Sequence, residues 1–171
     1  MVYSASGWFV MFDEFAAETL RKLEDPGLLL VGTKKDGKSN VMAIGWGYLG
    51  VMWRKKVFVV LVRPSRFTHE FIEEASEFTV NVPDERMNKI VAHCGTVTGR
   101  KHDKFKESKM HLIMGKKVKV PVIKECKIHY ECRVIHKLKV NSKLVPEKAK
   151  KTFYPKRDFH TVFFGEIVAA Y

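Results

Sequence analysis

Residues 28–47, LLLVGTKKDGKSNVMAIGWG, place two apolar runs on either side of a polar centre. The run from Leu28 to Val31 is typical of a buried strand, and Val41 to Gly47 has the β-branched and aromatic residues of a second strand. Between them lies Asp36-Gly37, a dipeptide strongly associated with tight hairpins because glycine adopts positive φ without strain. The stretch therefore predicts a β-hairpin closed by a two-residue turn.

The same stretch contains a match to a nucleotide-binding loop. Residues 32–39 fit the pattern G-x-x-x-x-G-K-S letter for letter and follow an apolar strand. Such a P-loop binds phosphate only where it opens a helix, because the first helix amides and the lysine surround the anion. Residues 40–47 contain glycines, β-branched residues and an aromatic, which make a poor helix and a good strand. The hairpin is preferred, and the P-loop stays as a remote alternative.

Outside this stretch, strand and helix patterns follow one another without a regular β-α-β order. Strands are expected at 57–62, 78–82, 123–140 and 161–170, and helices at 13–24, from an N-cap at Thr68, from an N-cap at Asp84 and around 103–105. Residues 141–159 have the pattern of a basic, proline-containing loop. About six strands with helices between them favour a small antiparallel barrel over a doubly wound sheet.

The composition is that of a globular protein with a strong positive charge. Its 171 residues are 46% hydrophobic and 29% charged, which suits one domain with a buried core. The 31 Lys and Arg against 19 Asp and Glu give a formal charge of +12, which attracts anions in general. No run approaches the roughly 20 apolar residues of a membrane span, and three cysteines do not suggest a secreted disulfide framework. We therefore expect a cytoplasmic protein.

Cys126, His129, Cys132 and His136 have a spacing that superficially resembles a zinc site. On a strand, His129 would point to the opposite face from the other three side chains. At about 3.3 Å per residue, Cys126 and Cys132 would lie roughly 20 Å apart, too far to share one ion. We expect small buried thiols on a strand and no metal site.

Residues 63–68, RPSRFT, carry the clearest binding chemistry in the chain. They offer two guanidinium groups, two hydroxyls and the start of a helix. Charge-assisted hydrogen bonds of this kind contribute about 1.5–3 kcal/mol each to phosphate binding, and free helix amides add donors. Residues 98–105 supply further cations on a glycine-containing loop. Each stretch alone is equally compatible with a solvated turn.

Several short motifs follow one another in order from about Asp25 to Val168. They are NVMAIGW at 40–46, RPSRFT at 63–68, EFTVNVP at 77–83, GRKHDKF at 99–105, Pro121, Glu131-Cys132 and DFHTVFFGEI at 158–167. Their order and spacing resemble the flavin reductase-like, FMN-binding split-barrel family. That family includes flavoredoxins, ferric reductases and NAD(P)H-dependent flavin reductases.

The resemblance implies a mainly β fold, a small antiparallel Greek-key split barrel with inserted helices. The barrel would occupy residues 25–171, and residues 1–24 would form an N-terminal extension with a short helix. The resemblance also implies a homodimer with FMN near its interface. No nucleic-acid or membrane partner is expected, because the basic residues are scattered and no aromatic-interleaved recognition motif is present.

The resemblance also implies a set of FMN-binding residues. Those expected along the isoalloxazine and ribityl chain are Asn40, Met42, Ala43, Ile44, Gly45 and Trp46. Those expected around the phosphate and ribityl hydroxyls are Arg63, Ser65, Arg66 and Thr68, with Arg100 and Lys101 on the other side. His160 is expected near the flavin or the incoming nicotinamide, as a candidate catalytic residue. Met42 and Trp46 would fit an apolar core equally well, and His160 a solvated strand end.

The activity implied is an NAD(P)H-dependent flavin or ferric reductase that passes electrons through bound FMN to a small-molecule or protein acceptor. The alternative is a flavoredoxin-like electron carrier that binds FMN in the same site but serves a protein partner without catalysing NAD(P)H oxidation. Residues 141–159 depart from the resemblance, because a shorter connection would be expected there. The donor and the acceptor are therefore left open.

Overall fold

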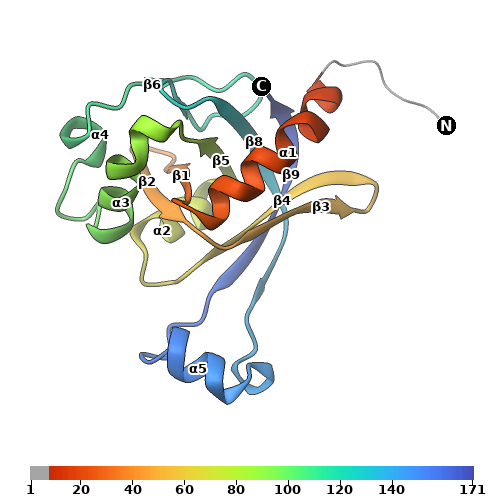
Figure 1. The fold of residues 1–171 in the computed structure, drawn as a ribbon, viewed down its shortest axis with the longest axis vertical. Coiled ribbons are helices and arrows are strands. Elements are labelled where there is room, and N and C mark those ends of the chain that lie inside the picture. The colour runs from red at the N-terminus through yellow and green to blue at the C-terminus, as the bar shows by residue number, and fades with distance from the viewer. Residues whose placement is uncertain (1–7) are drawn as a thin grey trace.

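The computed structural model describes residues 8–171, with side chains from residue 14 onward. Helices and strands alternate irregularly along this part of the chain (Figure 1). In order they are α1 (Trp8–Glu24), β1 (Leu28–Thr33), β2 (Ser39–Ile44), β3 (Gly47–Met52), β4 (Lys55–Val62), α2 (Phe67–Ala75), β5 (Glu77–Val82), α3 (Asn88–Thr96), α4 (Lys104–Glu107), β6 (Leu112–Ile113), β7 (Val122–Ile123), β8 (Ile128–Lys139), α5 (Glu147–Phe153) and β9 (Thr161–Ala170). Short 3₁₀ turns at Glu85–Met87 and Ser142–Leu144 precede α3 and α5.

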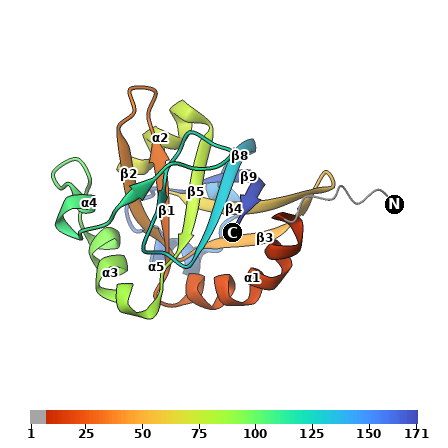
Figure 2. The same ribbon diagram turned by 90° about the horizontal axis from the view of Figure 1, so that it is seen from above.

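Seven strands form one antiparallel sheet in the order β2-β1-β5-β8-β9-β4-β3, and β6 pairs with β7 apart from it. The sheet curls on itself (Figure 2), so that Ile44 near one edge and Phe58 near the other share one apolar core. Tyr130 of the central strand β8 meets Phe58 edge-to-face, with ring centroids 5.3 Å apart. This is the mainly β split barrel that the sequence predicts.

The stretch quoted first forms the β1–β2 hairpin, with Thr33 paired to Ser39 at its tip. The Lys34 N–H donates to the Lys38 carbonyl at 2.8 Å, and the Gly37 N–H donates to the Lys34 carbonyl at 3.0 Å. Gly37 has a φ of 86°, so it is the left-handed residue of a three-residue loop. The predicted two-residue turn was therefore wrong by one residue. Strand β2 follows this loop directly, whereas a P-loop must be followed by a helix.

Helix α2 packs closely on β1, and this contact sets the wall of the site described below. A Cβ at Gly32 would lie 2.8 Å from the Phe71 Cβ, so only glycine permits this approach. The N-cap of α2 is Arg66 rather than the predicted Thr68. Thr68 lies in the first turn with its side chain fully buried, because its hydroxyl pairs with a neighbouring strand instead of capping the helix.

Helix α1 begins at Trp8, before the predicted start at Asp13, and is 17 residues long rather than short. Leu23 is buried in the barrel core, and the Thr19 hydroxyl lies 2.7 Å from the buried Tyr130 hydroxyl. The helix therefore packs on the barrel, while the division of the chain at residues 24 and 25 stays a prediction. Within the described residues, no helix has the length and apolarity needed to cross a membrane.

Residues 141–159 form a helical arm instead of the predicted loop. The arm comprises a 3₁₀ turn and α5, and it projects from the barrel at the far ends of β8 and β9 (Figure 1). Alanine and lysines after Pro146 favour a helix, and an i,i+3 pair joins Lys150 to Glu147 at 2.6 Å. Strand β3 was also not predicted. It is the edge strand beside β4 and carries glycines that obscure its pattern.

A second apolar cluster lies outside the barrel core, where α3 packs on β2. Val41 and Val91 belong to it, and a Cβ at Gly95 would touch the Ala43 Cβ at 3.4 Å. The cysteines divide between the two clusters, because Cys126 precedes β8 and faces this one while Cys132 lies in the barrel core. The packing of α3 brings the end of that helix beside the start of α2.

Candidate functional site

Two adjoining hollows form one groove between β2, the start of α2 and the loop after α3. They share Met42, Ala43 and Arg66, and have volumes of about 90 and about 150 Å³. The first also contains Asn40, Ser65, Phe67, Thr68, Cys94, Gly95, Val97, Thr98, Gly99 and Lys104. The second also contains Ile44, Gly45, Trp46, Leu61, Arg63 and His160. Residues 63–68 and 98–99, which are remote in the sequence, therefore face the same space.

The start of α2 gives the first hollow a set of unused donors. Its N-cap, Arg66, is extended and makes no side-chain capping bond, so the first amides of the helix lack a side-chain acceptor. Among the side chains of residues 14–171, none makes a hydrogen bond or ion pair with the Arg66 guanidinium. Free amides beside an unpaired guanidinium form a site suited to an anion with several oxygens.

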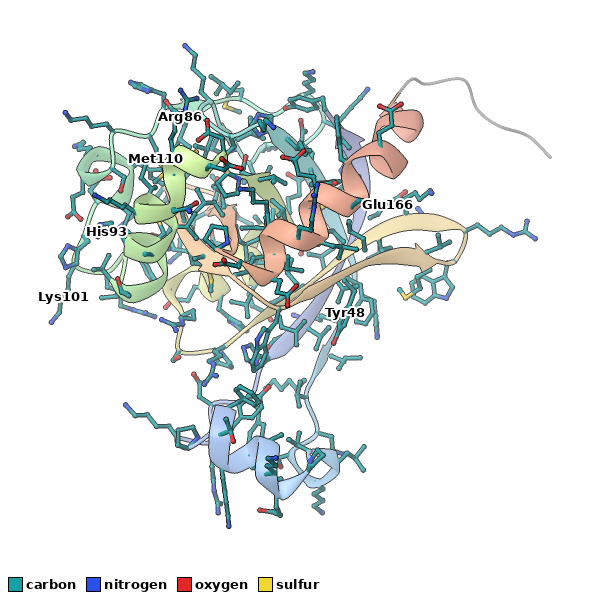
Figure 3. All side chains as sticks on the ribbon, viewed as in Figure 1. Tyr48, Arg86, His93, Lys101, Met110 and Glu166 are labelled. Atoms are coloured by element: carbon teal, nitrogen blue, oxygen red, sulfur yellow. The ribbon has the colours of Figure 1, made fainter. Side chains whose placement is uncertain are left out.

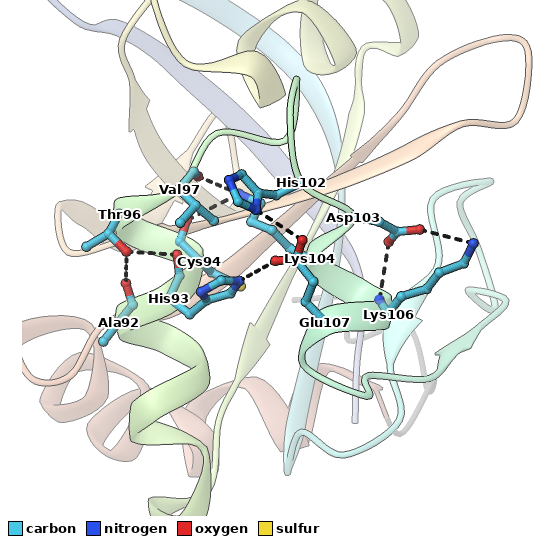
Figure 4. Close-up of polar contacts among 10 residues, drawn as sticks. All are labelled: Ala92, His93, Cys94, Thr96, Val97, His102, Asp103, Lys104, Lys106 and Glu107. Carbon is cyan, nitrogen blue, oxygen red and sulfur yellow. Dashed lines mark hydrogen bonds and ion pairs between the residues drawn. The ribbon is translucent and has the colours of Figure 1, made fainter.

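Lys104 adds a buried cation to the same hollow and is only 3% exposed. Its Nζ donates to the carbonyls of Cys94 at 3.2 Å and Val97 at 3.4 Å, which closes the C-terminal end of α3 (Figure 4). Burial lowers the pKa of this lysine, and the charge of Arg66 acts in the same direction. An anion between Lys104 and Arg66 would relieve that repulsion.

The floor of the first hollow is fixed by Asn40. Its Nδ2 donates to the Thr68 hydroxyl at 2.8 Å, in a buried bond between β2 and α2. Gly99 lies directly against it, since a Cβ at that position would be 1.9 Å from the Asn40 Oδ1. Any side chain at Gly99 would displace Asn40, so this glycine is required for the shape of the hollow.

His160 and Trp46 line the second hollow, with ring centroids 4.9 Å apart. The His160 Nδ1 lies 2.8 Å from the Tyr154 hydroxyl. Burial lowers the pKa of His160 to about 4, and the positive charges of Arg63 and Arg66 contribute to the same shift. His160 is therefore neutral at physiological pH and can donate or accept a hydrogen bond without carrying charge.

The arm holds two of the predicted phosphate-binding residues. The Arg63 Nη2 donates to the Phe153 carbonyl at 2.7 Å, and its guanidinium lies over the Tyr154 ring at 5.1 Å. The Ser65 hydroxyl donates to the Asp158 carboxylate. Both residues line the groove, but their side chains are already hydrogen-bonded to Phe153 and Asp158.

Arg100 and Lys101 differ in their placement. Arg100 borders the first hollow, since its Nη1 donates to the Ser65 carbonyl at 3.3 Å and its guanidinium lies over the Phe67 ring at 4.6 Å. It also pairs with Glu70. Lys101 lines neither hollow and lies at the outer edge of its loop (Figure 3). The structure thus gathers the predicted residues in one groove, with Arg100 at its border and Lys101 outside.

This chain is similar to several known proteins. Residues 25–171 match the model of the flavin reductase like domain. The chain belongs to the flavin reductase-like family. It is 34% identical over 131 residues to an uncharacterized protein from Archaeoglobus fulgidus, a match that covers 77% of this chain and 64% of that relative. The chain thus spans slightly less than two thirds of the length of that relative.

Two solved structures share the fold. A flavoredoxin from Methanosarcina acetivorans is 34% identical, with a TM-score of 0.65 over 85% of this chain and 67% of that one. An FMN-binding protein from Thermus thermophilus, solved with bound 1-cyclohex-2-enone, is 23% identical, with a TM-score of 0.64 over 85% of this chain and 69% of that one. The second likeness shows the shared fold alone.

The groove of this flavin reductase-like protein also contains residues that the sequence did not single out. Lys104 lies within the GRKHDKF motif, directly after Asp103, which caps α4 by accepting from the Lys106 N–H at 3.2 Å. The sequence signal for Lys104 was its position between the N-cap residue Asp103 and the apolar Phe105. Its burial could not be read from that position, because it depends on where α3 ends. Tyr154 and Asp158 contact the groove residues His160 and Ser65 from the segment expected to be a loop, and only Asp158 belonged to a quoted motif.

Proposed function

We propose that this chain binds FMN non-covalently in the groove and passes reducing equivalents from NAD(P)H to an acceptor. The observation that carries the proposal is the difference between the two ends of the groove. One end has free helix amides, Arg66 and Lys104, and the other has backbone from β2, Trp46 and a neutral histidine. An anionic tail attached to a flat, hydrogen-bonding ring fits this arrangement.

The hydrogen-bond donors of the first hollow suit a phosphate monoester. The unpaired Arg66 can donate two parallel hydrogen bonds to phosphate oxygens, and the α2 amides can donate to the remaining oxygens. Lys104 lies behind them with its amine already bonded to two carbonyls, so it contributes charge more than direct contact. The match of residues 25–171 to the flavin reductase like domain supports a flavin as the ligand.

FMN, when bound, would supply the hydride and electron transfer chemistry itself, so no side-chain nucleophile or general base is required. The residues of this chain position it and exclude water. Asn40 fixes the floor through Thr68, and Trp46, which lines the second hollow, meets the arm residue Phe153 edge-to-face at 5.2 Å. The neutral His160 offers a hydrogen bond at that end without adding positive charge.

A homodimer is part of the proposal. The β3–β4 hairpin extends from the barrel (Figure 1) and exposes three large apolar side chains, Tyr48 at 59%, Val51 at 68% and Trp53 at 66%. They lie on and just beyond β3, an edge strand with unpaired backbone groups. An exposed apolar edge of this kind favours association with a second copy.

Steady-state oxidation of NADH and NADPH by the FMN-loaded protein tests the proposed activity. A reductase would accelerate the loss of reduced nicotinamide when free flavin or a ferric chelate is the acceptor, relative to FMN alone. The likeness to the Methanosarcina flavoredoxin supports a carrier as the second candidate. A carrier would bind FMN and be reduced by dithionite, but would show no turnover with either nicotinamide.

A further inference from the structure

A cleft of about 520 Å³ opens on the arm, outside the groove and larger than either of its hollows. One face of α5 forms one side, and the 3₁₀ turn before α5 and residues 155–159 form the other. Small-molecule sites have volumes of about 300–1,000 Å³, so a cleft of this size suits a ligand such as a nucleotide. The flavin site proposed above does not use it.

The cleft has a large excess of positive charge. Lys143, Lys150, Lys151 and Arg157 line it, against the single carboxylate of Glu147. Lys150 is paired with Glu147 at 2.6 Å. In the part of the chain that the structure describes, Lys143, Lys151 and Arg157 make no ion pair. Three unneutralised cations around one concave surface favour a ligand that carries more than one negative charge.

Arg157 has a strained backbone. Its φ is 55°, in the left-handed region where glycine or asparagine is favoured. The Arg157 N–H donates to the Tyr154 carbonyl at 2.9 Å, so a turn holds the residue in this conformation. The turn therefore fixes the backbone of Arg157 beside the cleft, and its side chain lines the wall.

The wall of the cleft also has a flat aromatic surface. The rings of Tyr154 and Phe159 stack with centroids 4.6 Å apart and an interplanar angle of 24°. Both residues line the cleft beside the cations. A ligand that combines phosphate groups with an aromatic base matches both features, whereas inorganic phosphate would use only the charge.

Tyr154 connects the cleft with the groove. Its hydroxyl lies 2.8 Å from the His160 Nδ1, and its ring lies under the Arg63 guanidinium at 5.1 Å. His160 and Arg63 both line the groove. The side chains of Tyr154 and His160 therefore lie between the cleft and the second hollow of the groove.

We propose that the cleft on the arm binds a nucleoside diphosphate, the adenosine diphosphate part of the nicotinamide dinucleotide donor, while the nicotinamide end reaches the groove. The assignment of this ligand as part of the electron donor rests on the proposed function. The affinity of the cleft for a nucleoside diphosphate does not require flavin. Lys151 and Arg157 would bind the phosphates, and the face of Phe159 that is turned away from Tyr154 would bind the base.

Calorimetric titration of the full-length protein with ADP tests the cleft directly. The wild type should bind ADP saturably, and the K151A/R157A variant should bind it at least about tenfold more weakly, which corresponds to one lost charged hydrogen bond. The control is K148A/K156A, which removes the same charge from the arm at two exposed positions outside the cleft. Its affinity for ADP should stay within about twofold of the wild type, since only unspecific attraction is removed.

The same variants separate this proposal from the proposed flavin site. In the FMN-loaded protein, K151A/R157A should raise the KM for the reduced nicotinamide donor about tenfold and leave kcat and the flavin spectrum unchanged. A protein that fails to bind FMN but binds ADP through these two residues supports the cleft and contradicts only the proposed function. The cleft proposal is overturned if the wild type does not bind ADP, if the variant binds it equally well, or if pyrophosphate alone binds as tightly as ADP.

Discussion

The Tyr154 hydroxyl lies 2.8 Å from the Nδ1 atom of His160, and both side chains are buried. This contact joins the arm to the groove, because Tyr154 belongs to residues 141–159 and His160 lies just before β9. Burial, with the charges of Arg63 and Arg66, lowers the pKa of His160 to about 4. Burial and the two arginines therefore keep the imidazole neutral at this end of the groove.

His160 should make stability depend on pH. Its pKa is about 4 in the folded chain and 6.5 when unperturbed, so between these values the unfolded state binds more protons. The contribution of neutral His160 to the free energy of unfolding is therefore fully present above pH 6.5, and it falls as the pH decreases toward 4. The loss is on the order of 1–2 kcal/mol once partial hydration at the groove is allowed for. Urea unfolding at pH 7.5 and 4.5 measures it.

His160→Gln isolates this contribution, because every carboxylate and the similarly shifted His129 remain in the variant. The variant should lose less stability than the wild type between the two pH values. Equal losses in both proteins would mean that His160 is not held neutral by its surroundings.

Arg66→Ala should weaken FMN binding by about 10- to 100-fold, since a charged hydrogen bond of about 1.5–3 kcal/mol to phosphate is lost. Fluorescence quenching of FMN gives the dissociation constant. Arg86→Ala is the matched control, because it removes the same charge at the end of the barrel far from the arm (Figure 3). If both variants bind FMN alike, Arg66 does not contact the phosphate.

Gly99→Ala should disrupt the floor of the first hollow. The new Cβ would lie 1.9 Å from the Asn40 Oδ1 and force Asn40 away from Thr68. We expect a lower Tm and FMN affinity reduced at least about tenfold, from the loss of a buried hydrogen bond and the changed shape. Gly50→Ala is the control, because a Cβ there meets nothing within 4 Å. Unchanged FMN affinity in the Gly99 variant would contradict the assigned shape of the site.

Lys104→Met should destabilise the fold by about 1–3 kcal/mol, because two buried carbonyls at the end of α3 lose their donor. Denaturant unfolding measures the free energy. Lys106→Met removes the same charge from an exposed side chain two residues away and should change stability by less than about 0.5 kcal/mol. A Lys104 variant as stable as the Lys106 variant would exclude the capping role.

Local patterns were sufficient to predict the barrel and most of its elements. The β1–β2 hairpin followed from Asp36-Gly37, and β4, β5 and β9 followed from their apolar runs. The single strand predicted at 123–140 was wrong in its first part, because the chain breaks between β7 and β8 and β7 pairs with β6 instead. Strand β3 was missed because its glycines and exposed apolar residues do not alternate with polar ones. Helix α5 was missed because a lysine-rich segment between prolines has no apolar stripe, and it is a helix on the surface of an arm.

The site was predictable where its residues lie close together in the sequence. Residues 40–46 and 63–68 carry their own strand and helix signals, and the fold brings them into one groove. Lys104 could not be predicted, because its carbonyl partners belong to α3 and meet it only through tertiary packing. The engagement of Arg63 by Phe153 depends on the arm, whose helix the sequence did not reveal.

Titration of the purified, full-length protein with FMN, followed by the visible absorption of the flavin before and after dithionite, tests the central claim most directly. We predict saturation at one flavin per chain, a perturbed flavin spectrum and bleaching on reduction. A protein that remains colourless and leaves the spectrum of added FMN unchanged would contradict the assignment of the groove.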